Sequence, residues 1–244
     1  MSLLAIENLS KRFGGLQAVD RLSFSVDDGA IVGLIGPNGA GKTTVFGLIS
    51  GFIPADAGDV RFRGQSITGA RPHEIVARGL ARAFQIVRPF PHLSVLRNVV
   101  VGALARHPRR ADAEARAHAV LEEVGLAAKA PLLAGGLTLA DRKRLELARA
   151  LATEPKLLLL DEVMSGLNAT ETGRIVELIR AINARGIAVL LIEHVMRAVM
   201  SLSQRIVVIN YGERIAEGPP AAVANDPRVI EAYLGEAYAG AAPA

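Results

Sequence analysis

The sequence predicts an α/β protein in which a parallel, doubly wound sheet carries a β-rich N-terminal part and an inserted helical subdomain. Three observations support this prediction. Apolar runs of strand length, separated by glycine turns, dominate the first part of the chain. Residues 94–153 are rich in Ala, Leu, Arg and Glu and show no convincing strand pattern. After residue 155, apolar runs alternate again with helical segments, which is typical of βα units around a parallel sheet.

The N-terminal part is expected to form antiparallel strands. Leu3–Leu9 and Leu22–Val26 have strand character and bracket a turn at Phe13–Gly15. Asp59–Arg63 alternates between polar and apolar residues and stops at Gly64, so it predicts a further strand. Together these segments indicate a small β subdomain.

The rest of the chain divides into a helical insertion and a second set of strands. The helices are expected at Val95–Leu104, Ala111–Val124 and Leu139–Ala152, and the strands at Lys156–Leu160, Ile187–Ile192 and Arg205–Asn210. We therefore predict one domain over residues 1–244. Its α/β core comprises residues 1–85 and 155–244, and its helical subdomain comprises residues 86–154.

The most specific motif is Gly-Pro-Asn-Gly-Ala-Gly-Lys-Thr at Gly36–Thr43, a full match to the phosphate-binding P-loop. It follows an apolar strand at Ala30–Ile35 and opens a segment with helical spacing, Thr43–Ile49, which is the context that the motif requires. Its glycines let successive amides point at phosphate oxygens. Lys42 can reach the β- and γ-phosphates, and the Thr43 hydroxyl suits Mg²⁺. The motif predicts a P-loop NTPase core.

Two carboxylates follow the apolar run Leu157–Leu160 directly. Asp161 would hold Mg²⁺, directly or through water, and Glu162 would polarise the water that attacks the γ-phosphate. A solvated strand end is the alternative interpretation, but the strong P-loop favours the nucleotide site.

Two further polar residues stand at predicted strand ends. His194 follows Ile187–Ile192 after one glutamate, and Gln85 closes the run Ala81–Phe84. At such a sheet edge Gln85 can touch the metal or the attacking water. The alternatives are a helix-capping or surface histidine and a polar loop glutamine.

Composition excludes several other classes of protein. The net charge is +4, but the basic residues are spread out and aromatic residues make up only 4%, so nucleic-acid binding is not favoured. No apolar run approaches the roughly 18 residues of a membrane span. The first residues lack the pattern of a signal peptide, and there is no cysteine. These features predict a soluble cytoplasmic protein.

The order of the motifs resembles that of ATP-binding-cassette (ABC) ATPase subunits over nearly the whole chain. The resemblance implies that Phe13 stacks on adenine beside Val19, that Gln85 is the Q-loop glutamine and that His194 is the switch histidine. The ATP-binding residues that it implies are Phe13, Val19, Gly36, Pro37, Asn38, Gly39, Ala40, Gly41, Lys42, Thr43 and Thr44. The implied catalytic residues are Glu162, His194 and Gln85, and the implied metal ligands are Thr43, Gln85 and Asp161.

Three flanking segments narrow the resemblance. These segments are similar to the sequences of importers of branched-chain amino acids and related hydrophobic or amide solutes. They are Ala81–Phe90, Ile192–Arg197 and the stretch from Ala216–Gly218 through Ala232–Gly235. In particular, they resemble the larger of the two ATPase subunits of those systems. An ATPase of a lipopolysaccharide or lipid extraction system is one alternative, and a weakly hydrolysing regulatory ABC protein is another.

The resemblance also implies partners. Two cassettes, identical or different, dimerise head to tail, and each ATP lies with its Mg²⁺ between the P-loop of one subunit and the signature segment of the other. Transmembrane permease subunits would hold the pair at the cytoplasmic face of the inner membrane, through a groove near the Q-loop. Pro89–Pro91 is either part of that groove or an ordinary rigid turn.

The signature segment departs from the family pattern. Its residues are Leu137, Thr138, Leu139, Ala140 and Asp141, where Leu-Ser-Gly-Gly-Gln or Leu-Ser-Tyr-Gly-Gln is usual, and the D-loop residues are Ser165, Gly166, Leu167 and Asn168. Thr138 is expected to cap the following helix, with Asp141 reaching back to the amide of the cap. Asp141 places a negative charge near a triphosphate, and Arg142 and Lys143 are expected to offset it. Val163 replaces the usual proline after Glu162 and keeps an apolar group there.

Overall fold

The computed structural model describes residues 2–85 and 88–239 of the chain. It divides into two compact units, which are described separately here. The terminal unit comprises Met1–Arg71 and Ala188–Ala244, and the central unit comprises Pro72–Ile187. The central unit contains the expected helical insertion, residues 86–154, together with the elements that flank it.

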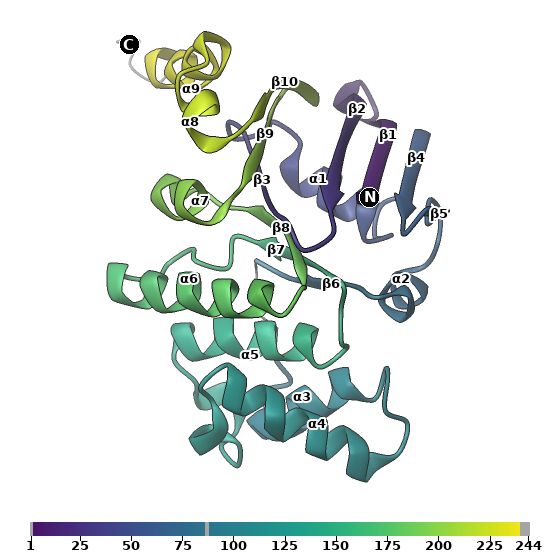
Figure 1. Ribbon diagram of the computed structural model, residues 1–244, viewed down its shortest axis with the longest axis vertical. Helices are drawn as coiled ribbons and strands as arrows, with labels where there is room; N and C mark the ends of the chain where they lie inside the picture. The colour runs from purple at the N-terminus through teal and green to yellow at the C-terminus, as the bar shows by residue number, and fades with distance from the viewer. Residues whose placement is uncertain (1, 86–87, 240–244) are drawn as a thin grey trace. The chain divides into compact units, whose positions relative to one another are not determined.

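An antiparallel sheet in the terminal unit confirms the expected N-terminal strands (Figure 1). Its order is β2-β1-β4-β5, and Ile6 of β1 lies opposite both Phe24 and Val60. The first two strands run further than expected because irregularities in their register, such as the one between Leu9 and Lys11, interrupt the alternation that the prediction follows. The strands are β1 (Ser2–Phe13), β2 (Leu16–Asp27), β4 (Ala57–Phe62) and β5 (Gln65–Ser66).

The second sheet of the terminal unit is parallel at its centre. Strand β3 (Ile31–Ile35) pairs in parallel with β8 (Ala188–Ile192) on one side and β9 (Arg205–Asn210) on the other. Every residue of β3 and β8 is buried, which explains why both appear in the sequence as unbroken apolar runs. Strand β10 (Glu213–Gly218), which was not predicted, returns antiparallel to β9. The helices of this unit are α1 (Lys42–Ile49), α7 (Met196–Leu202), α8 (Pro220–Ala224) and α9 (Pro227–Ala239).

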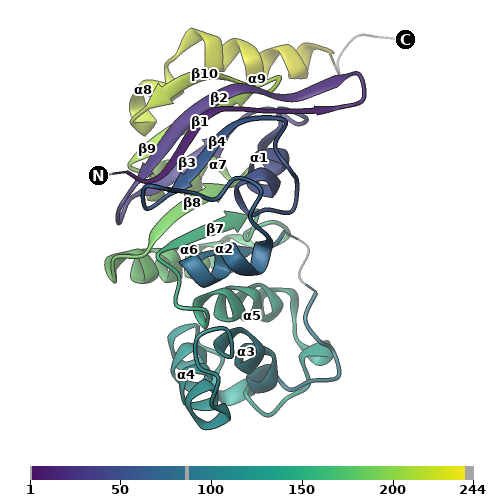
Figure 2. The ribbon, with the colours of Figure 1, turned by 90° about the vertical axis from the view of Figure 1, so that its right-hand side faces the viewer.

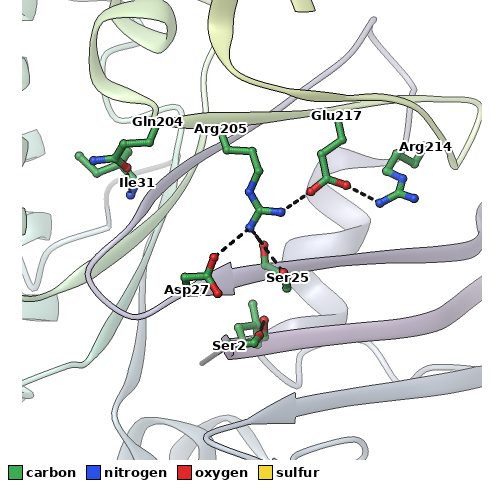
Figure 3. Close-up of polar contacts among 9 residues, drawn as sticks. Ser2, Ser25, Asp27, Ile31, Gln204, Arg205, Arg214 and Glu217 are labelled. Carbon is green, nitrogen blue, oxygen red and sulfur yellow. Dashed lines mark hydrogen bonds and ion pairs between the residues drawn. The ribbon is translucent and has the colours of Figure 1, made fainter.

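One arginine joins the two sheets of the terminal unit (Figure 3). Arg205 on β9 donates to the Ser25 carbonyl at 2.7 Å and forms an ion pair with Asp27 at 3.8 Å, both on β2. The same guanidinium pairs with Glu217 on β10, which also binds Arg214. The last strands of the chain are thereby tied to the N-terminal strands.

The central unit packs helices beside a pair of parallel strands, β6 (Leu80–Ala83) and β7 (Leu157–Asp161). Helices α3, α4 and α5 contact one another (Figure 2), and α3 approaches α5 closely at Gly102. A Cβ atom at Gly102 would lie 2.4 Å from the Arg149 carbonyl oxygen. The helices are α2 (Pro72–Arg78), α3 (Val95–Ala103), α4 (Arg110–Glu123), α5 (Leu139–Leu151) and α6 (Ala169–Ala184), with short 3₁₀ turns at Ala127–Lys129 and Ala134–Gly136.

Side chains fix the starts of three of these helices. The Ser94 hydroxyl accepts from the Arg97 amide at the start of α3, and Asn168 forms a capping box with Glu171 at the start of α6. The Thr138 hydroxyl accepts from the Asp141 amide, so the predicted cap of α5 is confirmed. Throughout residues 2–85 and 88–239, no helix combines the length and the apolar character that crossing a membrane requires.

Candidate nucleotide site

The P-loop connects β3 to α1 in the terminal unit. Its path requires glycine at two points, because a Cβ atom at Gly36 would lie 2.0 Å from the Ile209 carbonyl oxygen and one at Gly41 would lie 2.3 Å from that of Ala18. Gly212, in the turn between β9 and β10, approaches the same oxygen: a Cβ atom at Gly212 would lie 2.9 Å from the Ala18 carbonyl oxygen. The loop is therefore shaped by the start of β2 and by the end of β9.

The P-loop lysine lies along the loop that it follows. The buried Lys42 ammonium donates to the carbonyl oxygens of Gly36 and Pro37, both at 2.7 Å. Thr43 is exposed at the start of α1, where amides without helical partners favour anions. The loop thus presents an ammonium group, backbone amides and a hydroxyl, which are the groups that a polyphosphate with its cation requires.

Phe13 and Val19 occupy different environments in the terminal unit. Phe13 ends β1 and is 47% exposed, with the Lys11 ammonium 5.4 Å from its ring centroid. Val19 is fully buried, and one of its methyl carbons lies 3.6 Å from the Cβ position of Gly41. The Phe13 ring is accessible to a ligand, whereas the buried Val19 side chain packs against the P-loop at Gly41. His194 is exposed just after β8.

The two carboxylates at the end of β7 are held differently. Asp161 is buried and forms an ion pair with Arg82 of β6, with 2.6 Å between Nη2 and Oδ2. The Arg82 guanidinium also lies over the Phe84 ring, 4.8 Å from its centroid. The other carboxylate oxygen of Asp161, Oδ1, is buried and has no hydrogen-bond partner in the described part of the chain. A buried oxygen of this kind is suited to a hard cation or its bound water.

Glu162 and Gln85, which follow β7 and β6, meet through their side chains. The Gln85 side-chain amide donates to the Glu162 carboxylate. The Glu162 backbone is left-handed, with φ of 47°. Lys143, from the second turn of α5, donates to the backbone carbonyls of both residues, at 2.9 Å to Gln85 and 3.0 Å to Glu162.

The acidic residue of the signature segment is compensated, but by other residues than predicted. The Asp141 carboxylate accepts from Lys129 and, at 2.8 Å, from the Thr138 hydroxyl, and Arg144 lies 3.7 Å away. Arg142 and Lys143 were expected to offset this charge, and that expectation was wrong. Residues one or two positions after Asp141 on a helix do not face it, whereas Arg144, three positions after it, does. Arg142 donates instead to the Gly135 carbonyl at 3.0 Å. The expected bond from Asp141 to the amide of its cap was also wrong, since the carboxylate accepts from the Thr138 hydroxyl.

Charge compensation sets the ionisation of Asp141. Burial raises the pKa of its carboxyl. Hydrogen bonds from Lys129 and Thr138, together with the positive charges of Lys129 and Arg144, lower the pKa by more than burial raises it, so the pKa lies below the ordinary 3.8. Asp141 is therefore an anion at neutral pH that already has its cations.

Comparisons with known proteins show the family of the chain. The family model described as "ABC transporter" matches residues 19–165, and that described as "Branched-chain amino acid ATP-binding cassette transporter" matches residues 213–239. The chain belongs to the ABC transporter family.

Its relatives include ATP-binding proteins that resemble it over nearly their full length. The LivG protein of Salmonella typhimurium, named a high-affinity branched-chain amino acid transport ATP-binding protein, is 43% identical over 96% of this chain and 98% of its own. The BraF protein of Pseudomonas aeruginosa, with the same description, is 41% identical over the same shares. The ADP conformation of MJ1267, an ATP-binding cassette of an ABC transporter, has a TM-score of 0.88 at 32% identity and covers 96% of this chain and 99% of its own.

The ABC cassette therefore has the P-loop NTPase fold that the sequence predicted, and ATPase activity is expected of it. Its central unit also brings the D-loop to the signature segment. Ser165 donates its amide to the Glu162 carbonyl at 3.2 Å, and a Cβ atom at Gly166 would lie 3.0 Å from the exposed Leu139 side chain. Val163, in place of the usual proline, is buried.

The turn after the Q-loop, Pro89–Pro91, is firmly held in the ABC cassette. Asn98, which is fully buried, accepts from the Phe90 amide at 2.8 Å and donates to its carbonyl at 3.1 Å. The Phe90 ring is partly exposed under the Arg149 guanidinium, 5.3 Å from the ring centroid. Ile86 and Val87, which begin the expected insertion, lie outside the described residues.

Sequence reasoning missed Arg82, Lys129 and the role of Lys143. A signal existed for Lys143, because it shares a helical stripe with Ala140 and Leu147, which are buried. A lysine in such a stripe must find buried acceptors. Arg82 and Lys129 carry no comparable signal, since their partners lie on other elements.

Proposed function

We propose that this chain is the ATP-hydrolysing subunit of an importer of branched-chain amino acids or related small solutes. Its similarity to LivG and BraF over 96% of its length supports this proposal most directly. The match of residues 213–239 adds support, because this segment lies outside the P-loop and the carboxylates that many ATPases share.

Each site residue has a role that fits its surroundings. Lys42, Thr44 and the amides of Gly36–Thr43 bind the phosphates, and Phe13, with Val19 behind it, receives the adenine. Glu162 orients the attacking water and accepts its proton, a role worth roughly 10²–10⁴-fold in rate. Gln85 and His194 complete the site at the γ-phosphate.

A magnesium ion would suit the buried Asp161 oxygen, which has no hydrogen-bond partner among the described residues, and the hydroxyl of Thr43, a residue exposed to solvent. These two residues, with Gln85, would hold Mg²⁺. When bound, the ion neutralises charge on the phosphate oxygens. The role left to Arg82 is to hold the other Asp161 oxygen and so fix the direction of the carboxylate.

A second cassette would complete each site. Leu137–Asp141 of one chain and the D-loop, Ser165–Asn168, would act on the nucleotide of the partner, which is either a second copy or a related ATPase subunit. The pair would bind permease subunits and lie at the cytoplasmic face of the inner membrane. The division into core, residues 1–85 and 155–244, and helical subdomain, residues 86–154, is proposed with this scheme.

Solute uptake tests the proposal. In a strain that lacks this chain, uptake of radiolabelled leucine, isoleucine and valine should fall and should return with the wild-type protein. Glu162→Gln should fail to restore it, whereas Glu177→Gln, an exposed glutamate on α6, should restore it fully. Normal uptake in the deletion strain, with defective lipid assembly in its envelope, would contradict the proposal and favour lipid extraction.

A further inference from the structure

The ammonium group of Lys143 is buried beside the proposed catalytic residues of the central unit. Lys143 is only 3% exposed. Its Nζ lies 2.9 Å from the Gln85 carbonyl and 3.0 Å from the Glu162 carbonyl. A buried lysine is tolerated where its donors find acceptors, and here two carbonyl oxygens that follow different strands accept from the ammonium group.

These two carbonyls belong to the residues whose side chains meet. Gln85 follows β6 and Glu162 follows β7, and the Gln85 amide donates to the Glu162 carboxylate. One ammonium group therefore holds the two backbones at the point where they must stay close for this side-chain bond to form. Deleting that group removes a link between the two backbone segments just beyond the paired part of β6 and β7.

The backbone of Glu162 needs such an anchor. Its φ of 47° is in the left-handed region, which residues other than glycine seldom adopt. Such conformations persist where the surrounding structure fixes them. The Glu162 carbonyl accepts from the Ser165 amide at 3.2 Å as well as from Lys143, so a turn and a helix together fix the direction of the carboxylate.

Lys143 also connects Glu162 with the signature segment. It stands on α5 two residues after Asp141, whose carboxylate binds the capping residue Thr138. A displacement at the start of α5 would therefore move the ammonium relative to Gln85 and Glu162. The connection is short, and all of its contacts lie within one unit.

From these contacts we propose that Lys143 is a positioning residue that orients Glu162 for hydrolysis and couples its orientation to the signature helix. The inference rests on the proposed function, in which Glu162 orients the attacking water. In this role Lys143 acts through the two backbone carbonyls that accept from its ammonium group.

The test compares Lys143→Met, which keeps the chain length but has no donor, with Lys143→Arg, which keeps donors and charge. Steady-state ATPase rates and ATP affinity are measured for both. Lys143→Met should lower kcat by about 10- to 100-fold, less than the roughly 10²–10⁴-fold that a general base contributes, because Glu162 is misoriented and not removed, and it should leave the KM for ATP within about threefold. Lys143→Arg should recover a large part of kcat. Lys156→Met, an exposed lysine of the same unit, is the matched control and should match wild type.

A second comparison separates positioning from simple loss of structure. In a Glu162→Ala background, Lys143→Met should have no further effect on the residual rate, because its effect passes through Glu162. If Lys143→Met does not give a folded protein by circular dichroism, Lys143→Gln is measured in the same way.

The outcomes distinguish the two proposals. If wild type shows no Mg²⁺-dependent hydrolysis, the proposed function fails, and this inference fails with it. If wild type hydrolyses ATP and Glu162→Gln does not, but Lys143→Met retains the wild-type kcat, only the inference fails. It also fails if Lys143→Met raises KM with kcat unchanged, or if its effect is fully additive with Glu162→Ala.

Discussion

Lys129 and Asp141 form an ion pair that places a cation on the one acidic residue of the signature segment. Lys129 comes from the 3₁₀ turn before the segment and Asp141 from the first turn of α5. The pair changes the meaning of the departure from glutamine. An aspartate that would repel a triphosphate is largely neutralised within its own chain, and it holds the hydroxyl of Thr138.

This pairing predicts opposite results for its two members. Lys129→Gln should expose the negative charge and weaken ATP-driven dimerisation, whereas Asp141→Gln should leave ATPase activity equal to wild type or faster. Because Lys129 is 41% exposed, its contribution to the free energy of unfolding should be small, about 0.5 kcal/mol. Adding Asp141→Gln to Lys129→Gln should restore dimerisation, as measured by light scattering with saturating ATP. A tenfold loss of ATPase rate in Asp141→Gln alone would reveal a positive role for the carboxylate.

The stability of the protein should depend on Asp141 at acidic pH. Its pKa is lowered below 3.8 in the folded protein, so its contribution is fully present above the unfolded pKa and is lost as the pH falls through the folded pKa. Urea unfolding of wild type and Asp141→Asn should therefore differ by a constant free energy above about pH 5, and the difference should shrink below pH 3.8. A difference that grows toward acidic pH would contradict the assigned direction.

Thr138 should contribute both to the helix start and to the nucleotide. Thr138→Ala should lower the free energy of unfolding by about 1 kcal/mol through loss of the cap, and it should also weaken hydrolysis. Thr138→Ser keeps the hydroxyl and is the matched control for both measurements. Equal ATPase rates for the alanine and serine variants would assign Thr138 to the fold alone.

Glu162→Gln should separate ATP binding from hydrolysis. The variant should still bind ATP, because Lys42, Thr43 and the P-loop amides remain, but its turnover should fall by roughly 10²–10⁴-fold. Trapped ATP should then increase the mass of the particle to that of a dimer in light scattering, since each site is half built in one chain. Glu177→Gln should show neither effect, and hydrolysis near the wild-type rate in Glu162→Gln would remove Glu162 from the chemistry.

Phe13 should contribute to nucleotide affinity through its exposed ring. One stacked aromatic side chain is worth about 1–3 kcal/mol, so Phe13→Ala should weaken ATP binding several-fold or more, with little preference among purines. Leu16→Ala provides a control, because Leu16 is 68% exposed on the same hairpin. Equal affinities of the two variants in a nucleotide titration would exclude Phe13 as the adenine platform.

Local patterns in the sequence were enough for most of the elements. Strand, P-loop and helix follow one another at Ala30–Ile49, and a Thr-x-x-Asp pattern marks the start of α5, because both depend on neighbours in the chain. The lengths of β1 and β2 could not be predicted, since register irregularities break their alternation. Strand β10 was not predicted because its charged residues interrupt the apolar pattern of a strand. Its pairing with β9 stabilises it as a strand in the fold.

The contacts within the candidate site were harder to predict. The sequence placed Gln85 and Glu162 at predicted strand ends, but it did not predict the bond between their side chains, which the parallel pairing of β6 and β7 allows. The partners of Asp141 were not predicted either. Lys129 reaches Asp141 from a 3₁₀ turn, and the sequence of that turn shows no periodic pattern that indicates its geometry. Helix spacing alone could have indicated Arg144 in place of Arg142 and Lys143.

The carbonyl of Ala18 is a point where three distant stretches of the chain meet, because Gly41 and Gly212 both approach it too closely for any side chain. The conformation of the P-loop therefore depends on β2 and on the turn after β9 as well as on its own strand and helix. An inserted residue at Gly14 or Gly15, where a Cβ atom would meet nothing within 4 Å, has room in the hairpin, whereas one beside Ala18 would displace the loop. Changes of length among the N-terminal strands of homologous proteins should accordingly collect at the hairpin tip and spare its base.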